Sequence, residues 1–437
     1  MGIILLALAL SFTFAALMLA VECRRAPLWD ETEYIAAAQA IRDRGLFGNW
    51  RASRRTYLYP LFLSLLPQAG RVAHRAMLGA LQWLAWAAAS IWMSRTMNRS
   101  SSYGRRAVWF AALCNPFVLI YTVEYLTDAI STALVFATLC CAVNVSSSED
   151  HVSARSLLLG VALGAGIMIR PSNVALVLMA FGACVSGRPW PRWARALVFA
   201  FLGAMIVLAP QLALNWTRYH AIQPLMVERL GAQQLSWGLA HVKYATAAVP
   251  GRSPGVWYSH PFSWWTIPLK SVALVDQDLV FPYNETLHPT YRWPVAILHL
   301  PLVGFGILGL AILCAESGSG RPVARLAAAG LLFLVALYSG TAVEARFGLP
   351  IVAILYLFAP AGLALAVRAM KGPRLRSASI TVAWLCLVGL LFWGARTLTT
   401  LMEGSGARLA FRSNLTSRPS VQYAGQSDAP EKIGASD

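Results

Sequence analysis

The sequence predicts an all-α polytopic membrane protein, and three observations carry that prediction. The chain has 437 residues, of which 57% are hydrophobic and only 13% are charged, and its mean hydropathy is +0.57. A soluble domain has about 25% charged residues, so half of that fraction indicates a surface that mostly faces lipid. The length accommodates about eleven transmembrane helices of about 20 residues each, together with their loops.

Apolar runs bounded by charge, Pro or Gly define eleven candidate spans. Their approximate bounds are 2–22, 76–94, 107–123, 128–145, 156–169, 171–186, 196–214, 293–315, 323–340, 347–367 and 378–396. Residues 2–21 lack the basic start and the A-x-A cleavage site of a signal peptide, so we expect a retained first span. The fifth and sixth runs are short and joined by Arg170-Pro171, which predicts a hairpin or a broken pair of helices.

Polar stretches interrupt the spans at 23–75 and at 215–292. We expect both to be outer loops of one transmembrane domain that covers residues 1–403. The residues beyond it, 404–437, are polar and rich in Ser and Gly, which predicts a disordered tail. Six of the seven cysteines lie in apolar runs, where a thiol behaves as a small hydrophobic group, so no disulfide framework or metal ligand set is expected.

The basic residues predict which side of the membrane each loop faces. One alternating set of short loops carries 14 Lys and Arg residues and the other set carries two. Because basic loops stay inside, we expect the first set and the N-terminus in the cytoplasm. Residues 24–75 oppose this pattern, since they contain nine arginines yet fall outside. Lipid phosphate is a partner that would favour positive charge there.

The carboxylates gather on the predicted outer side. Between the first and last spans, the cytoplasmic loops hold only Glu149, Asp150 and Glu316. The formal charge of +17 does not predict a nucleic-acid partner, because the arginines flank the spans as membrane topology requires. There is also no Walker loop, no G-x-G-x-x-G and no H-E-x-x-H motif, so neither nucleotide-driven transport nor a nucleotide-sugar donor is supported.

The first candidate motif is Leu28-Trp29-Asp30-Glu31-Thr32-Glu33-Tyr34, just after the first span. Asp30 is a suitable N-cap for a helix that runs to about Arg44, and Asp30-x-x-Glu33 fits a capping box. Capping alone does not require Glu31 or a position at the end of a span. A helix cap and a functional acidic pair are therefore both open readings.

The second motif contains Glu124 and Asp128 in a very short outer loop. If this stretch is helical, the two acids share a face and repel each other. A bound cation or a polar substrate would relieve that repulsion. The alternative is two solvated loop acids.

The third and fourth motifs supply arginines and aromatic residues. Glu344 and Arg346 enter the tenth span, and Arg170 lies at the tip of the short pair of spans. An arginine fork suits phosphate oxygens, although an ion pair with Glu344 or anchoring of a helix end are simpler readings. The fourth motif has Tyr57, Tyr59 and Pro60 before the apolar residues 61–66 and after Arg54 and Arg55. This pattern is typical of a short helix in the membrane interface or of an aromatic belt.

Taken in order, these motifs resemble the GT-C glycosyltransferases, in particular the branch of protein O-mannosyltransferases and lipid A aminoarabinose transferases. The resemblance covers roughly residues 1–370, and Asn215-Trp216-x-Arg218-Tyr219 is similar to a segment of the same branch. Two features depart from it. The chain ends soon after the expected eleventh span, so we expect no counterpart of the C-terminal periplasmic domain of the aminoarabinose transferases, and Phe347 stands where the family often has Tyr.

The resemblance implies an inverting transfer of a sugar from a polyprenyl-phosphate donor to a glycan, lipid or protein acceptor on the periplasmic or extracytoplasmic face. Asp30 resembles the family's base, with Glu31 as the fallback. Arg170, Arg346, Arg54 and Arg55 are candidates for the phosphate, and Tyr57 and Tyr59 line the same segment. Glu124, Asp128 and Glu344 are expected to bind sugar hydroxyls, an acceptor or a cation.

The resemblance leaves three matters open. Some GT-C enzymes use a divalent cation and others do not, so a cation is a possible cofactor here. The expected location is the bacterial inner membrane, with membrane lipid as a further partner. A transporter or flippase of a lipid-linked or small anionic substrate is the alternative function, although no internal repeat supports it. A non-catalytic scaffold is the other rival.

Overall fold

The computed structural model describes most of the chain before residue 224 and several helices after it. The described residues are 2–27, 30–48, 55–100, 105–147, 151–186, 188–223, 271–272, 274–275, 288–316, 320–339, 345–371, 384 and 388–389. Within these ranges every regular element is a helix, which confirms the predicted all-α class.

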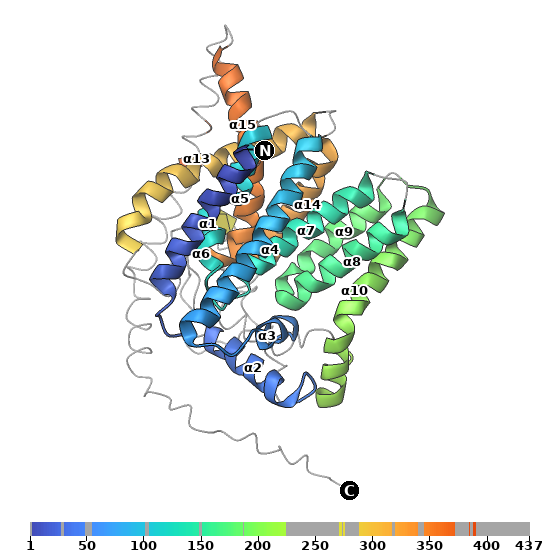
Figure 1. Cartoon of the computed structure of the whole chain (residues 1–437). Coiled ribbons are helices and arrows are strands. Elements are labelled where there is room, and N and C mark those ends of the chain that lie inside the picture. The colour runs from blue at the N-terminus through green and yellow to red at the C-terminus, as the bar shows by residue number, and fades with distance from the viewer. Residues whose placement is uncertain are drawn as a thin grey trace, which may run out of the picture.

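Eight helices in the described residues are long and apolar enough to cross a membrane. They are α1 (Gly2–Glu22), α4 (Arg71–Ser100), α7 (Asp128–Ser146), α8 (Val152–Ile169), α10 (Trp190–Tyr219), α13 (His288–Ala315), α14 (Arg321–Ser339) and α15 (Leu349–Lys371). Figure 1 shows them as a bundle, with α1 and α10 toward opposite sides of the view.

Two further predicted spans are shorter apolar segments, Ala107–Tyr121 and Pro171–Val185. The first consists of α5 (Arg105–Leu113) and α6 (Pro116–Tyr121), and the second of the 3-10 helix η1 (Pro171–Ala175) and α9 (Leu176–Val185). Ten of the eleven predicted spans thus coincide with helical segments. The eleventh, 378–396, lies outside the described residues except at three positions, as does the predicted tail 404–437.

The third span is broken, whereas the sequence analysis treated it as continuous. Pro116 has no backbone N–H, so a helix cannot continue through it without losing a hydrogen bond. Asn115 ends the first part and caps the second, accepting hydrogen bonds at its Oδ1 from the backbone N–H groups of Phe117 (3.1 Å) and Val118 (3.3 Å). The break lets the chain turn before the short loop that carries Glu124.

Close packing of α8 against α10 depends on glycine. A Cβ on Gly160 would lie 1.9 Å from the carbonyl oxygen of Ala200, and one on Gly203 would lie 2.1 Å from that of Leu157. The two helix backbones therefore touch at positions where no larger residue fits. The α8 and α10 helices contact the segment at residues 56 and 57, which directly precedes α3.

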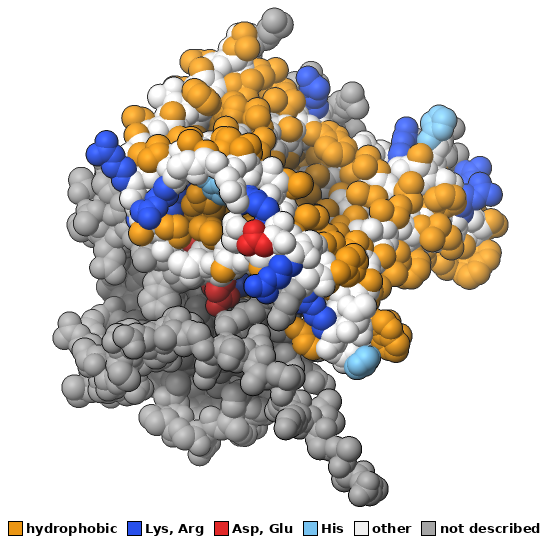
Figure 2. All heavy atoms as spheres, turned by 60° about the horizontal axis from the view of Figure 1, so that its bottom comes forward, with side chains coloured by type: hydrophobic (Ala, Val, Ile, Leu, Met, Phe, Trp, Pro, Cys, Tyr) orange, Lys and Arg blue, Asp and Glu red, His pale blue; other side chains and the backbone are white. Residues whose placement is uncertain are grey.

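Two short helices cover one end of the bundle, at the bottom of Figure 1: α2 (Asp30–Arg44) and α3 (Leu58–Ser64). The helix expected from Asp30 to Arg44 is confirmed, and Gly45, at φ +77°, ends it by donating its N–H to the carbonyl of Ile41. In Figure 2, acidic side chains lie near the middle of the view with basic ones around them, and apolar side chains cover the upper and right parts.

Candidate active site

Asp30 is the first residue of α2, so its carboxylate lies at the positive end of the helix dipole. Its side chain is 21% exposed, whereas that of Glu31 is fully buried. Consecutive residues of a helix point about 100° apart, which is why neighbouring acids face different surroundings. Of the two acids that the sequence singled out as bases, Asp30 is the accessible one.

Two arginines that are far apart in the sequence pair with Asp30. Arg55 Nη2 lies 2.6 Å from Asp30 Oδ1, and Arg346 Nη2 lies 2.9 Å from Asp30 Oδ2. Arg55 also pairs with Glu33 at 3.0 Å and lies over the ring of Tyr34, 4.6 Å from its centroid. Each carboxylate oxygen of Asp30 therefore has its own charged donor.

These arginines decide the protonation of Asp30. Burial of the carboxyl opposes ionisation, but the charges of Arg55 and Arg346 outweigh it and lower the pKa of Asp30 from its ordinary 3.8 to about 2. Asp30 is therefore a carboxylate at neutral pH. A carboxylate with so low a pKa is a weak base as long as both arginines remain on it.

Arg170 and Asp128 form a second pair close to Arg346. Arg170 donates to Asp128, and both side chains are buried. The guanidinium of Arg170 lies 4.7 Å from the ring centroid of Phe347, and that of Arg346 lies 5.6 Å from the same ring. Phe347 thus contacts two of the arginines predicted to bind phosphate, and it also stacks on Tyr338.

Residues 56 and 57 are fixed to the α8 and α10 helices, which places Arg55. The Thr56 hydroxyl donates to the carbonyl of Met168 (2.5 Å), and the Tyr57 hydroxyl donates to that of Val207 (2.9 Å). The Gln211 side chain also accepts from the backbone N–H of Tyr57 (2.9 Å). The hydroxyl of Tyr57 therefore donates its hydrogen bond to a carbonyl of α10.

Tyr59 is fully buried, and its ring meets that of Tyr34 edge-on at 5.0 Å between centroids. Its hydroxyl has no hydrogen-bond partner among the described residues. Burial, with the nearby Tyr34, Glu31 and Asp128, raises the pKa of Tyr59. Tyr59 therefore remains a neutral phenol.

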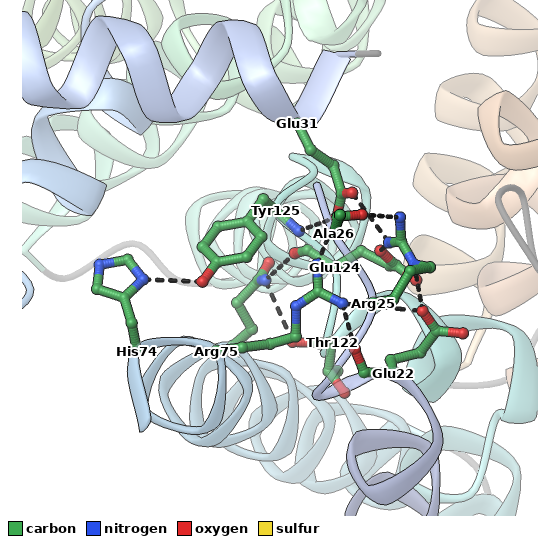
Figure 3. A network of polar contacts seen from close by, with 10 residues as sticks. Glu22, Arg25, Ala26, Glu31, His74, Arg75, Thr122, Glu124 and Tyr125 are labelled. Carbon is green, nitrogen blue, oxygen red and sulfur yellow. Dashed lines mark hydrogen bonds and ion pairs between the residues drawn. The ribbon is translucent and has the colours of Figure 1, made fainter. Parts of the chain in front are cut away.

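Glu31 and Glu124 lie together in a separate group of charged side chains, drawn in Figure 3. Arg25 pairs with both of them, and the Glu31 carboxylate also accepts from the backbone N–H of Tyr125 (3.0 Å). Both acids are at most 1% exposed. Their predicted roles as fallback base and substrate ligand remain predictions, against which this burial argues.

The condition for a shared face of Glu124 and Asp128, a helix that runs through both residues, is not met. Glu124 lies in a non-helical turn and Asp128 begins α7, so the i,i+4 relation of a helix does not hold. Arg25 pairs with Glu124 and Arg170 pairs with Asp128. Each of the two acids is therefore paired with a different arginine.

Two predicted site residues, Arg54 and Glu344, lie outside the described residues. The expected pair of Glu344 with Arg346 is thus not tested, although Arg346 does pair with Asp30. In the described part of the chain, no three His, Cys, Asp or Glu side chains are grouped to hold a metal ion. The possible divalent cation stays a prediction, and no chemical step is assigned to it.

Sequence reasoning missed Glu22, Arg25 and Arg75. Arg25 and Arg75 are two of nine arginines in residues 24–75, and nothing local distinguishes them from arginines that face lipid phosphate. Arg75 directly precedes the apolar run at 76–94, which was a usable signal, because a fully buried arginine needs an acidic partner.

The fold and this charged end together define a polytopic membrane protein with the fold of the GT-C glycosyltransferases. In particular, the chain is similar to ArnT from Cupriavidus metallidurans bound to undecaprenyl phosphate, with a TM-score of 0.57 and 13% identity over 94% of this chain and 76% of that one. The apo state of the same protein gives a TM-score of 0.50, with 13% identity over 94% and 75%.

An oligosaccharyltransferase from Archaeoglobus fulgidus, tethered to an acceptor peptide, gives a TM-score of 0.48, with 13% identity over 91% of this chain and 55% of that one. No protein-family model matches the sequence, and a search of curated proteins finds no match either. The likeness is therefore one of fold.

Proposed function

We propose that this chain is an inverting glycosyltransferase that moves a sugar from a polyprenyl-phosphate donor to an acceptor on the periplasmic or extracytoplasmic face of the inner membrane. The observation that carries the proposal is the partly exposed Asp30 carboxylate between Arg55 and Arg346 at one end of a GT-C bundle. ArnT, which shares the fold, has been solved bound to undecaprenyl phosphate, a lipid of the proposed product class.

The proposed reaction needs a base and a fixed positive charge. The acceptor hydroxyl attacks the anomeric carbon, its proton passes to Asp30, and the bond from that carbon to the phosphate oxygen breaks. The transition state is oxocarbenium-like, and negative charge collects on the departing phosphate. The guanidinium groups of Arg55, Arg346 and Arg170 are the described candidates to bind that phosphate.

Donor binding would also activate the base. The two arginines that lower the pKa of Asp30 are the ones proposed to bind phosphate. A phosphate that takes hydrogen bonds from Arg346 draws the guanidinium away from Asp30, so the pKa of Asp30 rises and the carboxylate becomes a better proton acceptor. Base strength would then be coupled to the presence of the donor.

The remaining predicted ligands keep more general roles in the proposal. Asp128 orients Arg170, and Glu344, Arg54, Tyr57 and Tyr59 stay predicted to line the donor or acceptor. The acceptor class, whether glycan, lipid or protein, is left open. The basic loops predict a cytoplasmic N-terminus, which puts α2 and the site on the outer side.

The first experiment identifies the substrates. Mass spectrometry of envelope glycans and of polyprenyl-phosphate sugars, in cells with and without the protein, should reveal one glycan that loses a sugar and one lipid-linked sugar that accumulates. The accumulating lipid then serves as the donor for the purified protein.

The second experiment tests the base. Asp30→Asn is expected to lower sugar transfer by about 100-fold or more, since general-base groups contribute about 10²–10⁴-fold. Asp43→Asn is the matched control, because Asp43 is an exposed acid on the same helix. Full transfer by Asp30→Asn would refute the role of Asp30. Movement of the lipid across proteoliposomes without sugar transfer would instead favour the transporter.

A further inference from the structure

Two amide side chains of α10 form a chain of hydrogen bonds that leads away from the site around Asp30. Gln211 accepts at Oε1 from the backbone N–H of Tyr57 (2.9 Å) and donates from Nε2 to Oδ1 of Asn215 (3.0 Å). Asn215 in turn donates from Nδ2 to the backbone carbonyl of Gln223 (2.6 Å). These three hydrogen bonds, the amide chain, join Tyr57 to Gln223 through α10.

The direction of the amide chain is fixed by its two ends. A backbone N–H can only donate, and a backbone carbonyl can only accept. Gln211 must therefore turn its oxygen toward Tyr57, and Asn215 must turn its nitrogen toward Gln223. The nitrogen of Gln211 then faces the oxygen of Asn215, so reversing either amide alone would oppose like groups at both of its bonds. The orientation of each amide thus depends on the other.

Both amides are buried in a helix that is long and apolar enough to cross a membrane. Gln211 is 1% exposed and Asn215 is 0% exposed. An amide in such a place costs free energy unless its hydrogen bonds are made. Apolar side chains would avoid that cost, but they would remove the acceptor of the Tyr57 N–H and the donor to the Gln223 carbonyl. The two amides therefore bind segments outside α10 as well as each other.

At one end, the amide chain fixes the segment that carries Arg55. Tyr57 is held twice on α10, by its N–H on Gln211 and by its hydroxyl on the carbonyl of Val207 (2.9 Å). Val207 and Gln211 are four residues apart, so they lie on one face of the helix. Arg55 lies close to Tyr57 in the sequence and reaches Asp30 at 2.6 Å. A shift of Gln211 would therefore be passed to a guanidinium of the site.

At the other end, the amide chain fixes the start of the polar stretch at 215–292, which the sequence predicts as the large outer loop. His220 follows α10 at φ 52° and donates its N–H to the carbonyl of Trp216 (3.0 Å), so the chain turns back over the end of the helix. The carbonyl of Gln223 thereby meets the side chain of Asn215. Both the site and the loop are thus attached to the same pair of amides.

We propose that Gln211 and Asn215 are positioning residues, which hold the Arg55 segment and the start of the large outer loop in one register. The catalytic part of this inference rests on the proposed function, in which Arg55 is a candidate to bind the departing phosphate. A substrate that moves the start of the loop then also moves Arg55, and by linkage a ligand on Arg55 acts on the loop. Neither amide touches the substrate.

The first test follows the start of the loop with a spin label and does not depend on any activity. In the purified full chain without native cysteines, Ile222→Cys carries the label, because Ile222 is 74% exposed and adjoins Gln223. Gln211→Met removes two bonds of the amide chain and leaves the bond from Asn215 to Gln223 unaltered. We nevertheless expect the electron paramagnetic resonance spectrum to show faster motion of the label in Gln211→Met, because Asn215 is no longer oriented.

Thr217→Ala is the matched control for the label. The Thr217 hydroxyl also lies on α10, but it donates to a carbonyl of its own helix, that of Leu214 (3.1 Å). Its label spectrum should match that of the unaltered helix, whereas Asn215→Leu should give the largest increase in motion. A label that moves equally in Gln211→Met and Thr217→Ala would overturn the coupling.

The second test measures sugar transfer after a change at the loop end. Asn215→Leu spares the bond between Tyr57 and Gln211 but removes the partner that orients the Gln211 amide. It is expected to lower kcat about tenfold with little change in the donor KM, because a small displacement of Arg55 matters most where negative charge collects in the transition state. Thr217→Ala should transfer at the unaltered rate.

The outcomes separate this inference from the proposed function. Unchanged kinetics in Asn215→Leu would overturn the positioning role, and so would a rise in donor KM alone, which would indicate direct contact with the donor. Absence of transfer in the unaltered protein would refute the proposed function, while the label would still decide on the coupling. If Gln211→Met or Asn215→Leu does not fold, the other variant still tests the amide chain from its own end.

Discussion

At the residue scale, the site is controlled by which arginine each carboxylate contacts. Asp30 pairs with Arg55 and Arg346, and Asp128 pairs with Arg170. Glu31 pairs with Arg25 and Arg75. These ion pairs need no ligand. A ligand with its own negative charge can, however, replace one of the acids as the partner of an arginine. The phosphate of a lipid donor is such a ligand.

The pH profile of transfer should report on Arg346. Asp30 acts as a base only when ionised, so activity falls as the pH drops through its pKa, which is about 2 in the free protein. Arg346→Gln removes one of the charges that favour ionisation, so the acid limb of kcat/KM should move to higher pH. Arg95→Gln, at an exposed position of α4, is the control. An acid limb that does not move in Arg346→Gln would contradict the pairing.

Stability should report on the pair of Asp128 and Arg170. Asp128→Asn leaves a buried guanidinium without its counter-charge and is expected to cost about 3 kcal/mol of unfolding free energy. Adding Arg170→Met removes the unpaired charge and should recover part of that loss, as seen in the thermal midpoint. Transfer should not recover, because Arg170 is proposed to bind phosphate. A double variant as unstable as the single one would argue against the pair.

At the element scale, α8 and α10 support the site from beside it. Their backbones touch at Gly160 and Gly203, and their carbonyls at Met168 and Val207 accept the hydrogen bonds that fix Thr56 and Tyr57. Arg55 adjoins these two residues. The position of one arginine of the site therefore depends on how closely two membrane helices approach.

Gly160→Ala tests this dependence. Its added Cβ would lie 1.9 Å from the Ala200 carbonyl, so the helices must separate, and overpacking costs about 1–3 kcal/mol. We expect a lower thermal midpoint together with slower sugar transfer. Gly182→Ala is the matched control, because nothing lies within 4 Å of a Cβ there, and the gain in helix propensity should keep or raise stability. Similar midpoints for the two variants would contradict the close packing.

At the scale of the whole molecule, the arrangement of the spans was largely predictable from hydropathy. Ten of the eleven apolar runs are helical, but their ends were not set by apolarity alone: α4 begins at Arg71, five residues before the predicted run at 76–94. The break at Asn115 was missed because an apolar window averages over Pro116. The domain division at 403 remains a prediction.

The site was predictable in kind but less so in its partners. Asp30, Arg55 and Arg346 were all singled out from the sequence, and they do meet. What local pattern cannot give is which acid meets which arginine, because Glu31 and Arg75 are 44 positions apart and Arg25 and Glu124 are 99 apart. Local pattern also does not predict burial, and the two neighbouring acids differ in burial: the side chain of Asp30 is partly exposed, whereas that of Glu31 is buried.

The orientation of the whole chain can be measured by labelling. In a background without native cysteines, Asp43→Cys on α2 should react with a membrane-impermeant maleimide in intact cells. Ala154 lies near the start of α8, next to one of the basic loops that are expected in the cytoplasm. Ala154→Cys should therefore react only after permeabilisation. Both positions are exposed. The reverse labelling pattern would place α2 and the proposed site in the cytoplasm.

The contact between Asp30 and Arg346 also has a consequence in time. These residues are 316 positions apart, so at roughly 5–20 residues per second the ribosome delivers the second roughly 15–60 seconds after the first. During that interval Asp30 has at most Arg55 beside it. A chain released before the tenth span would therefore carry the acid without its second arginine, which couples completion of the site to synthesis of the segment that enters the tenth span.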